Sequence, residues 1–319
     1  MPPLLAEIDR EAGAVTLHRI TRTGDRSAPR LLEREGLRAM VGAPDLEADE
    51  GAVGSSSAGG AAPDVGQEIS LVTVNADGLG DYPISPAARM EAILSSVLSL
   101  VPAPDFLLLQ EVVADTYEVA RRRLQGWKLQ RRSSYVGEYF NVTAVRGAAS
   151  SPLDKTTSYA FPASDSGRHV LTVRRNGWAV ANVHAESGSH QDQRDQREVQ
   201  LQYLSRMHEL HEEQAWVLGG DLNAREGEDH CLRAEGWRDV WEEARAQGVC
   251  GGVAWTWRRG GSAARFDRIY THACGASTLE CVRVSRIEKV WGVFTDHVAL
   301  HCAPHDPCCA GATFREGRG

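Results

Sequence analysis

The sequence has no run of apolar residues near the roughly 20 that a membrane-spanning helix needs. It also has no charged-then-apolar segment after Met1 of the kind that directs secretion. Its 7 cysteines form no Cys-x-x-Cys pair and no Cys/His spacing typical of zinc, and an odd number in 319 residues does not predict a disulfide framework. We therefore expect a reducing, intracellular compartment and no membrane partner.

Two common catalytic motifs and a broad positive charge are absent as well. The sequence contains no Gly-rich loop for nucleotide phosphates and no Gly-x-Ser-x-Gly elbow. Its formal net charge of −8 argues against a protein that coats nucleic acid through a broad basic surface. Local arginine runs such as 121–123 and 174–175 could line a groove, although such runs more often lie on solvated faces.

A segment rich in Gly, Ala and Ser divides the chain into an appendage and a main domain. Residues 49–66 offer little side-chain area to bury, so they predict a flexible linker. Residues 1–48 form an N-terminal appendage of unknown fold, in which a small helix around Leu31 to Met40 competes with disorder. The main domain spans 67–303, and the Pro, Cys and Gly content after Ala303 predicts a loose C-terminal tail over 304–319.

The main domain alternates strand-like and helix-like segments, which indicates an α/β fold with many strands. Ser85 is a typical N-cap and Pro86 a typical first helical residue, and apolar residues then recur at helical spacing. Helices are predicted from Pro86 to before Pro102, at 114–124 and at 192–211. Strands are predicted at 69–74, 105–111, 140–145, 170–173, 178–183, 215–218, 266–270, 281–284 and 298–302.

Polar side chains stand at the ends of six of these strands. They are Asn75 with Asp77, Glu111, His184, Asp221 with Asn223, Asp267, and the pair Asp296-His297 before the last strand. Taken singly, each has a structural explanation. A lone histidine is more often a hydrogen-bonded core residue than a catalyst, and the Gly219-Gly220-Asp221 turn uses ordinary turn residues. Six such strand ends in one chain favour a common site.

The chemistry of these side chains is mutually consistent. Glu and Asp are the hard oxygen ligands that Mg²⁺ takes together with water and substrate phosphate, and Asn and His add hydrogen-bond donors. Hydrolysis of a phosphodiester needs a metal on the phosphoryl oxygens, a base that orients water, and donors for the developing charge. The sequence supplies all three, so it predicts a metal-dependent phosphodiesterase.

The order of these motifs resembles the endonuclease/exonuclease/phosphatase superfamily over roughly Ile69 to Cys302. Within it, the segments Val240-Trp241-Glu242, Thr256-Trp257 and Arg265-Phe266-Asp267-Arg268-Ile269 resemble the tyrosyl-DNA phosphodiesterase 2 family, the 5′-tyrosyl-DNA phosphodiesterases of DNA repair. Ala185, Leu222 and Thr295 stand where that family usually has Leu, Thr and Ser, and none of the three removes a polar group needed for chemistry.

The resemblance implies a four-layer α/β sandwich, in which two packed mixed β-sheets are flanked by helices. It also implies Mg²⁺ as cofactor, with Mn²⁺ as a substitute. The metal ligands would be Glu111, Asp77 and Asp296. The catalytic group would be Asn75, Asp221, Asn223, His297 and Asp267, of which Asp221 orients water and Asp267 holds His297. Phosphate and substrate would contact His184, Ser187, Arg225 and Trp257.

The implied partner is a DNA 5′ end that carries a tyrosyl adduct on a single-stranded overhang, bound by a monomer, in the nucleus by resemblance or in the cytoplasm. Trp257 and Tyr139 are candidates for stacking on bases, against core packing as the ordinary role of such rings. Alternative readings are an abasic-site endonuclease, an RNA 3′ exonuclease, a sphingomyelinase-like enzyme, an inactive binding scaffold, and an adaptor role for residues 1–66.

Overall fold

The computed structural model describes residues 4–9, 14–19, 30–32, 69–80, 84–100, 103–132, 139–147, 155–210, 215–248, 255–259, 261–272, 282–287, 297 and 299–304. Near the N-terminus, β1 (Leu4–Asp9), β2 (Ala14–Arg19) and β3 (Arg30–Leu32) pair antiparallel in one small sheet. Of the segment Leu31 to Met40, for which the sequence left a helix or disorder open, Leu31 and Leu32 pair with Thr16 and Val15 in that sheet, and residues 33–40 lie outside the described residues. The linker 49–66 lies outside the described residues.

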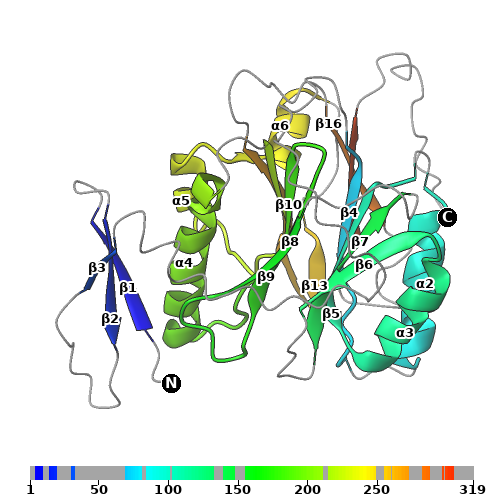
Figure 1. Cartoon of the computed structure of the whole chain (residues 1–319), viewed down its shortest axis with the longest axis horizontal. Coiled ribbons are helices and arrows are strands. Elements are labelled where there is room, and N and C mark those ends of the chain that lie inside the picture. The colour runs from blue at the N-terminus through cyan, green and yellow to red at the C-terminus, as the bar shows by residue number, and fades with distance from the viewer. Residues whose placement is uncertain are drawn as a thin grey trace.

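Two six-stranded mixed sheets form the main domain (Figure 1). The first has the order β16-β17-β4-β5-β7-β6, and the second has the order β12-β15-β11-β10-β9-β8. Their strands are β4 (Leu71–Asn75), β5 (Phe106–Val112), β6 (Trp127–Arg131), β7 (Phe140–Arg146), β8 (Lys155–Ala160), β9 (His169–Arg175), β10 (Trp178–His184), β11 (Ala215–Asp221), β12 (Arg238–Asp239), β15 (Asp267–His272), β16 (Val282–Ile287) and β17 (Ala299–Pro304).

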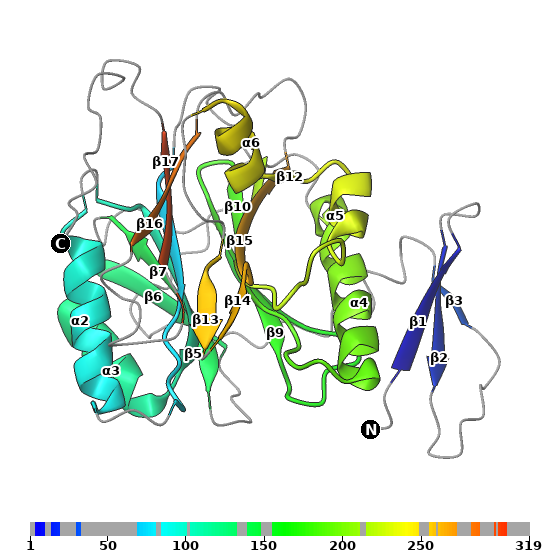
Figure 2. The same ribbon diagram turned by 180° about the vertical axis from the view of Figure 1, so that it is seen from behind.

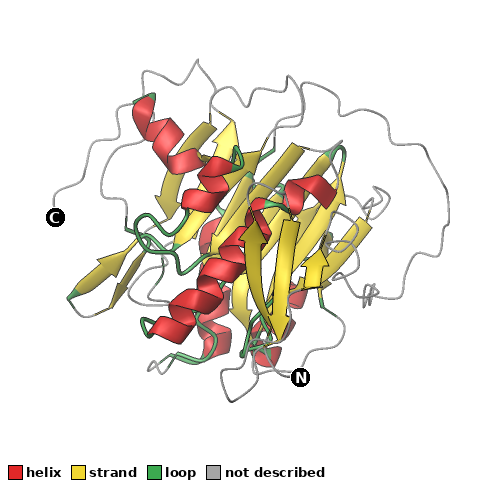
Figure 3. Cartoon of the chain, turned by 90° about the vertical axis from the view of Figure 1, so that its left-hand side faces the viewer, coloured by secondary structure: helices red, strands yellow, loops and turns green. Residues whose placement is uncertain are grey.

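Helices cover the outer faces of both sheets, which confirms the predicted four-layer arrangement (Figures 1 and 2). Helices α2 (Pro86–Leu98) and α3 (Ala114–Arg123) lie on the first sheet. Helices α4 (Gln191–Ser205) and α5 (His230–Ala234) lie on the second. Helix α6 (Val240–Ala246) packs at one end of the sandwich, and the short hairpin of β13 (Trp257–Arg259) and β14 (Ser262–Ala264) lies toward the other end (Figure 2). Figure 3 shows the helices, in red, and the strands, in yellow, from the side.

The apolar core falls into three layers that match this architecture. One layer joins α2 and α3 to β4, β5 and β7, and a second joins α4 and α5 to β10 and β11. The third lies between the sheets, where Leu108 of β5 meets Gly219 of β11: a Cβ at Gly219 would approach Leu108 to 2.8 Å. Strands buried on both faces carry continuous apolar runs, and this is why 178–183 and 215–218 were readable as strands.

Element boundaries differ from the sequence predictions where side chains compete for backbone groups. The helix predicted over 192–211 ends at Ser205, whose carbonyl accepts from Nε1 of Trp237 and lies 3.0 Å from Nδ1 of His208; the 3₁₀ helix η1 (Met207–Leu210) follows. Strand β17 runs one residue past the predicted domain end at Ala303. Strands β6, β8 and β12 to β14, with α5 and α6, were not predicted. No described helix is long and apolar enough to cross a bilayer.

Candidate active site

Parallel strand pairing brings the predicted polar residues to one end of the sandwich. β4 runs parallel to β5 with Asn75 opposite Gln110, and β10 runs parallel to β11 with His184 opposite Asp221. β15 lies antiparallel to β11 and starts there, with Asp267 opposite Asp221. Since the carboxyl ends of parallel strands meet at one edge, residues 36 to 146 positions apart come within hydrogen-bond distance.

The side chain of Asn75 lies between two carboxylates. Its Nδ2 donates to Oε1 of Glu111 at 3.1 Å and to Oδ2 of Asp221 at 3.0 Å, and its Oδ1 accepts from the Asp77 backbone N–H at 2.8 Å. Burial raises the pKa of Glu111; the hydrogen bond from Asn75 opposes this rise, and the charges of Asp221 and Asp77 add to it. Three carboxylates at one pocket wall therefore create an excess of negative charge.

The backbone is strained at three of these polar positions. Asp77, Glu111 and Asn223 have φ values of 46°, 53° and 49°, in the left-handed region that residues with a Cβ rarely adopt. At Glu111 the pairing of β5 with β7 is irregular, which turns the glutamate out of the ladder. Gly78 allows the neighbouring loop to approach, because a Cβ there would lie 2.2 Å from the carbonyl oxygen of Glu111. Such local strain is typical of functional sites.

Asp267 and His297 form a buried pair next to Asp221. Oδ2 of Asp267 lies 2.7 Å from Nδ1 of His297, and Nε2 of the same ring lies 3.7 Å from Oδ2 of Asp221. Asp267 is fully buried, and burial raises its pKa, whereas the charge and hydrogen bond of His297 oppose the rise. The Asp267 backbone N–H donates to Oγ1 of Thr256 at 2.9 Å, which fixes the start of β15. Because Asp267 contacts the Nδ1 side of His297, the Nε2 side of the ring faces the pocket.

His184 lies beneath the two carboxylates, with Nε2 at 3.6 Å from Glu111 and 3.7 Å from Asp221. Burial lowers its pKa well below the usual value, and the charge of Arg168 lowers it further. Arg168 itself is buried. It donates to the hydroxyl of Tyr139 at 2.9 Å and to Oγ of Ser187 at 3.2 Å. Tyr139 packs against His184 with ring centroids 5.6 Å apart, so these four side chains form one connected group.

A pocket of about 590 Å³ opens above this group. Besides the carboxylates, Asn223 and His297, its lining includes Ser187, Arg225, Trp257 and Phe266. The Trp257 and Phe266 rings lie 5.2 Å apart, and the Arg225 guanidinium lies over Phe266 at 5.8 Å. The wall thus combines hydroxyl and guanidinium donors with aromatic surface, a set suited to a phosphate attached to flat rings.

All but one of the site residues predicted from the sequence lie at this end of the sandwich. Asp77, Glu111, Ser187, Asp221, Asn223, Arg225, Trp257 and His297 line the pocket, and Asn75, His184 and Asp267 hold them from below. Asp296 lies outside the described residues. The sequence analysis missed Arg168, which comes from the loop between β8 and β9 and carries no motif of its own.

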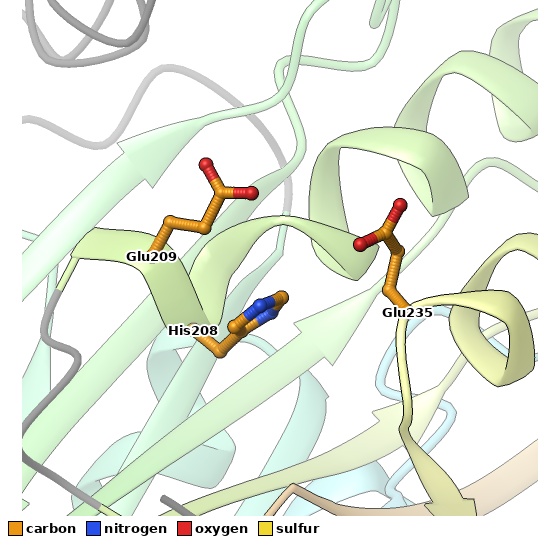
Figure 4. A group of neighbouring side chains, drawn as sticks. All are labelled: His208, Glu209 and Glu235. Carbon is orange, nitrogen blue, oxygen red and sulfur yellow. The ribbon is translucent and has the colours of Figure 1, made fainter. Parts of the chain in front are cut away.

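A second group of ligand-type side chains lies at the opposite end of the second sheet. His208, Glu209 and Glu235 have ligand atoms within 4.8 Å of one another (Figure 4). Arg206 donates to Glu209, and this hydrogen bond, together with the charges of Glu209 and Glu235, raises the pKa of Arg206. The arginine thus already supplies a positive charge to this group. His208 stacks on His272, which lies opposite Trp216 where β11 pairs with β15. That position is five residues along β11 from Asp221, which lies opposite Asp267, so the group is remote from the pocket.

Comparison with known proteins agrees with this geometry. Residues 72–297 match the profile of the Endonuclease/Exonuclease/phosphatase family, which covers more than half of the chain. The chain belongs to this family. Its members are hydrolases such as nucleases and phosphatases, so the chain is a phosphodiesterase- or nuclease-like member. No curated protein sequence matches it.

Solved structures of the family share its fold at low sequence identity. TDP2 from C. elegans has a TM-score of 0.58 and 23% identity and covers 74% of this chain and 74% of its own. D. rerio TDP2, complexed with single-strand DNA product, has a TM-score of 0.60 and 21% identity over 75% of this chain and 99% of its own. An AP endonuclease from Archaeoglobus fulgidus has a TM-score of 0.57 and 14% identity over 73% and 98%. The predicted superfamily and fold are thereby confirmed.

Proposed function

We propose that the chain is a Mg²⁺-dependent phosphodiesterase that hydrolyses the 5′-phosphotyrosyl bond between DNA and a trapped protein. The observation that carries the proposal is the hydrogen-bonded set of Asn75, Glu111 and Asp221 at the floor of a pocket whose wall holds Arg225 and Trp257. Acidic residues suit a divalent metal, donors suit phosphate, and aromatic rings suit bases or a tyrosine ring.

The residues present fit a divalent cation with oxygen ligands. Glu111 and Asp77 line the pocket beside Asp221, and burial together with the like charges raises the pKa of Glu111 when no cation is near. In the proposal Glu111 and Asp77 would hold the metal; the third predicted ligand, Asp296, lies outside the described residues. A metal held there would supply Lewis-acid polarisation of the phosphoryl group.

The chain's own residues orient the attacking water. Asp221 accepts from Asn75 through Oδ2 and from the Asn223 backbone N–H at 2.9 Å through Oδ1, so its carboxylate is held in one orientation. Asn223 donates its Nδ2 to the carbonyl of Ala185 at 3.1 Å, which leaves its Oδ1 as the acceptor that faces a water. In the proposal Asp221 accepts a proton from that water while Asn223 fixes its position.

Donors around the phosphate stabilise the developing charge. Asp267 holds His297 through Nδ1, and in the proposal Nε2–H of the same ring donates toward the phosphoryl oxygens. Ser187 and Arg225 also line the pocket, and the planar guanidinium of Arg225 suits two phosphate oxygens. A tyrosine phenol has a pKa of about 10, well below that of an alcohol, so it leaves with little help from a general acid.

The test is hydrolysis of matched substrates by the purified protein with Mg²⁺ or with EDTA. The substrates are 5′-phosphotyrosyl DNA, 3′-phosphotyrosyl DNA, abasic duplex, RNA with a free 3′ end, and sphingomyelin. The proposal predicts Mg²⁺-dependent release of tyrosine from the 5′ adduct in preference to the others. Activity confined to the abasic duplex would assign the specificity of the AP endonuclease neighbour instead. Lack of activity on every substrate would favour a binding scaffold.

A further inference from the structure

The buried residue Arg197 on helix α4 has no part in the chemistry described above, although it touches both loops that carry the phosphate donors. Its side chain is fully buried, with a relative exposure of 0%, and its charge faces inward. A buried arginine is costly unless its donors are paired, so its retention in the core calls for a reason.

Arg197 donates hydrogen bonds to two loops from different parts of the chain. Nη1 donates to the carbonyl of Glu186 at 3.0 Å and to that of Gly188 at 3.2 Å, on either side of Ser187. Nε and Nη2 donate to the two oxygens of Glu228 at 2.8 and 3.0 Å. The planar fork therefore links the Ser187 loop to the Glu228 loop in a fixed geometry that a single ammonium does not reproduce.

Glu228 connects Arg197 to the turn that carries Arg225. Its Oε2 accepts from the Arg225 backbone N–H at 2.9 Å, as well as from Arg197. Burial raises the pKa of Glu228, but the hydrogen bonds from Arg197 and the Arg225 backbone outweigh it, so the net pKa is lowered and the carboxylate stays charged. The turn that carries Arg225 is thus fixed through one charged carboxylate.

Two neighbours of Arg197 on the same helix face hold the Ser187 loop as well. Gln193 and Gln200 lie four residues before and three residues after Arg197, so all three share one side of α4. Oε1 of Gln193 accepts from the His190 backbone N–H at 3.2 Å, and Oε1 of Gln200 accepts from that of Glu186 at 2.7 Å. Gly188 is required for this approach, because a Cβ there would lie 1.9 Å from Oε1 of Gln193.

We infer that Arg197 is a positioning residue that sets the spacing between Ser187 and Arg225, and hence the affinity of the pocket for a substrate phosphate. The inference rests on the proposed function, because it assigns both donors to phosphate. Arg197 itself does not line the pocket. Its effect on turnover must therefore pass through the two loops.

The experiment compares Arg197→Lys, which keeps the charge but loses the fork, with Arg233→Lys as a matched control. Arg233 likewise makes a two-point ion pair with a glutamate, Glu242, although at an exposed position, and it does not line the pocket. With 5′-phosphotyrosyl DNA and Mg²⁺, we expect Arg197→Lys to raise KM about tenfold or more and to lower kcat less. Binding of a 5′-phosphorylated oligonucleotide in EDTA should weaken by a similar factor. We expect Arg233→Lys to leave both quantities near wild type.

A merely structural role gives a different pattern. Loss of folded protein lowers kcat through the active fraction and leaves KM unchanged, and that result would overturn the inference. In the Arg225→Ala background, Arg197→Lys should have a much smaller effect than in wild type, because both changes disturb the same contact. Full additivity would contradict this route. Should Arg197→Lys fail to fold, Glu228→Gln, at a partly exposed position, tests the same link: an unchanged KM would refute it.

Two results separate an error in the proposed function from an error in the positioning role of Arg197. If wild type hydrolyses none of the substrates, the phosphodiesterase assignment is wrong. If wild type is active and Arg197→Lys matches Arg233→Lys in KM, kcat and oligonucleotide binding, only the positioning role is wrong.

Discussion

Replacing Asp267 by Asn probes how the pocket controls the charge of His297. The pair is buried, with Oδ2 of Asp267 2.7 Å from Nδ1 of His297, and Asp267 is fully removed from solvent. Asn has nearly the same shape, so the packing persists while the negative charge is lost. For unit charges 4 Å apart at an effective dielectric constant near 20, the lost attraction is about 4 kcal/mol. The lost attraction is the one between Asp267 and the protonated imidazole that the mechanism uses as a donor.

Because removal of one donor that stabilises transition-state charge typically costs about 10²- to 10³-fold in kcat, we expect Asp267→Asn to lower kcat on 5′-phosphotyrosyl DNA by about that factor at neutral pH, with a smaller change in KM. Single-turnover hydrolysis at saturating Mg²⁺ measures the effect. The control is Asp229→Asn, another buried carboxylate, which bonds to Tyr270 and Arg233 and does not line the pocket. Thermal unfolding of both variants reports on the fold. A folded Asp267→Asn variant that retains kcat within threefold of wild type would refute the assigned role of the pair.

Three further predictions follow from the site and the core. Glu111→Gln should lower Mg²⁺-dependent turnover by at least about 10²-fold, and full activity of this variant would exclude Glu111 as a metal ligand. EDTA should lower wild-type turnover by at least a similar factor, and full activity in EDTA would exclude a metal. Burial lowers the pKa of His169 to about 4, against 6.5 in the unfolded chain, so the unfolded state binds more protons between these values. The free energy of unfolding should therefore fall by up to roughly 3 kcal/mol as pH drops from 6.5 to 4. His169→Gln should reduce this pH dependence in urea unfolding, and an unchanged pH dependence would contradict the role of His169. Gly220→Ala should lower the unfolding midpoint strongly, because its Cβ would lie 1.9 Å from the carbonyl oxygen of Val183 at a φ of 148°; a wild-type midpoint would show that the turn relaxes.

The sequence predicted the elements whose signals are local. Helix α2 begins as expected: Oγ of Ser85 accepts from the Ala88 backbone N–H at 3.3 Å, and Pro86 occupies the first turn. The buried strands β10 and β11 were readable because both faces are covered and their residues are mostly apolar. Strand β6 was missed because all five of its residues are only half buried, and its polar composition gives no strand pattern.

The sequence predicted which residues form most of the site, but only some of the contacts among them. Asn75 and Asp221 could be found because each stands at the end of an apolar strand, and parallel pairing with a neighbouring strand brings such ends together. His297 could be found because it stands just before β17, whose antiparallel pairing with β4 brings its start to the same edge. The contacts of Arg168 depend on how its loop folds back onto Tyr139, and no spacing in the sequence encodes that return. The link from Arg197 through Glu228 likewise depends on tertiary packing between α4 and a distant loop.

The most direct test of the account is release of tyrosine from a 5′-phosphotyrosyl oligonucleotide by wild type and by Asp221→Asn, each with Mg²⁺. Asp221 accepts from Asn75 and from the Asn223 backbone through different oxygens, so an isosteric amide keeps the size of the side chain and one of these two hydrogen bonds while it removes the proton acceptor. The account predicts rapid Mg²⁺-dependent release by wild type and a loss of several orders of magnitude in kcat for the folded variant. Equal rates for the two proteins, or release by wild type that persists in EDTA, would contradict it.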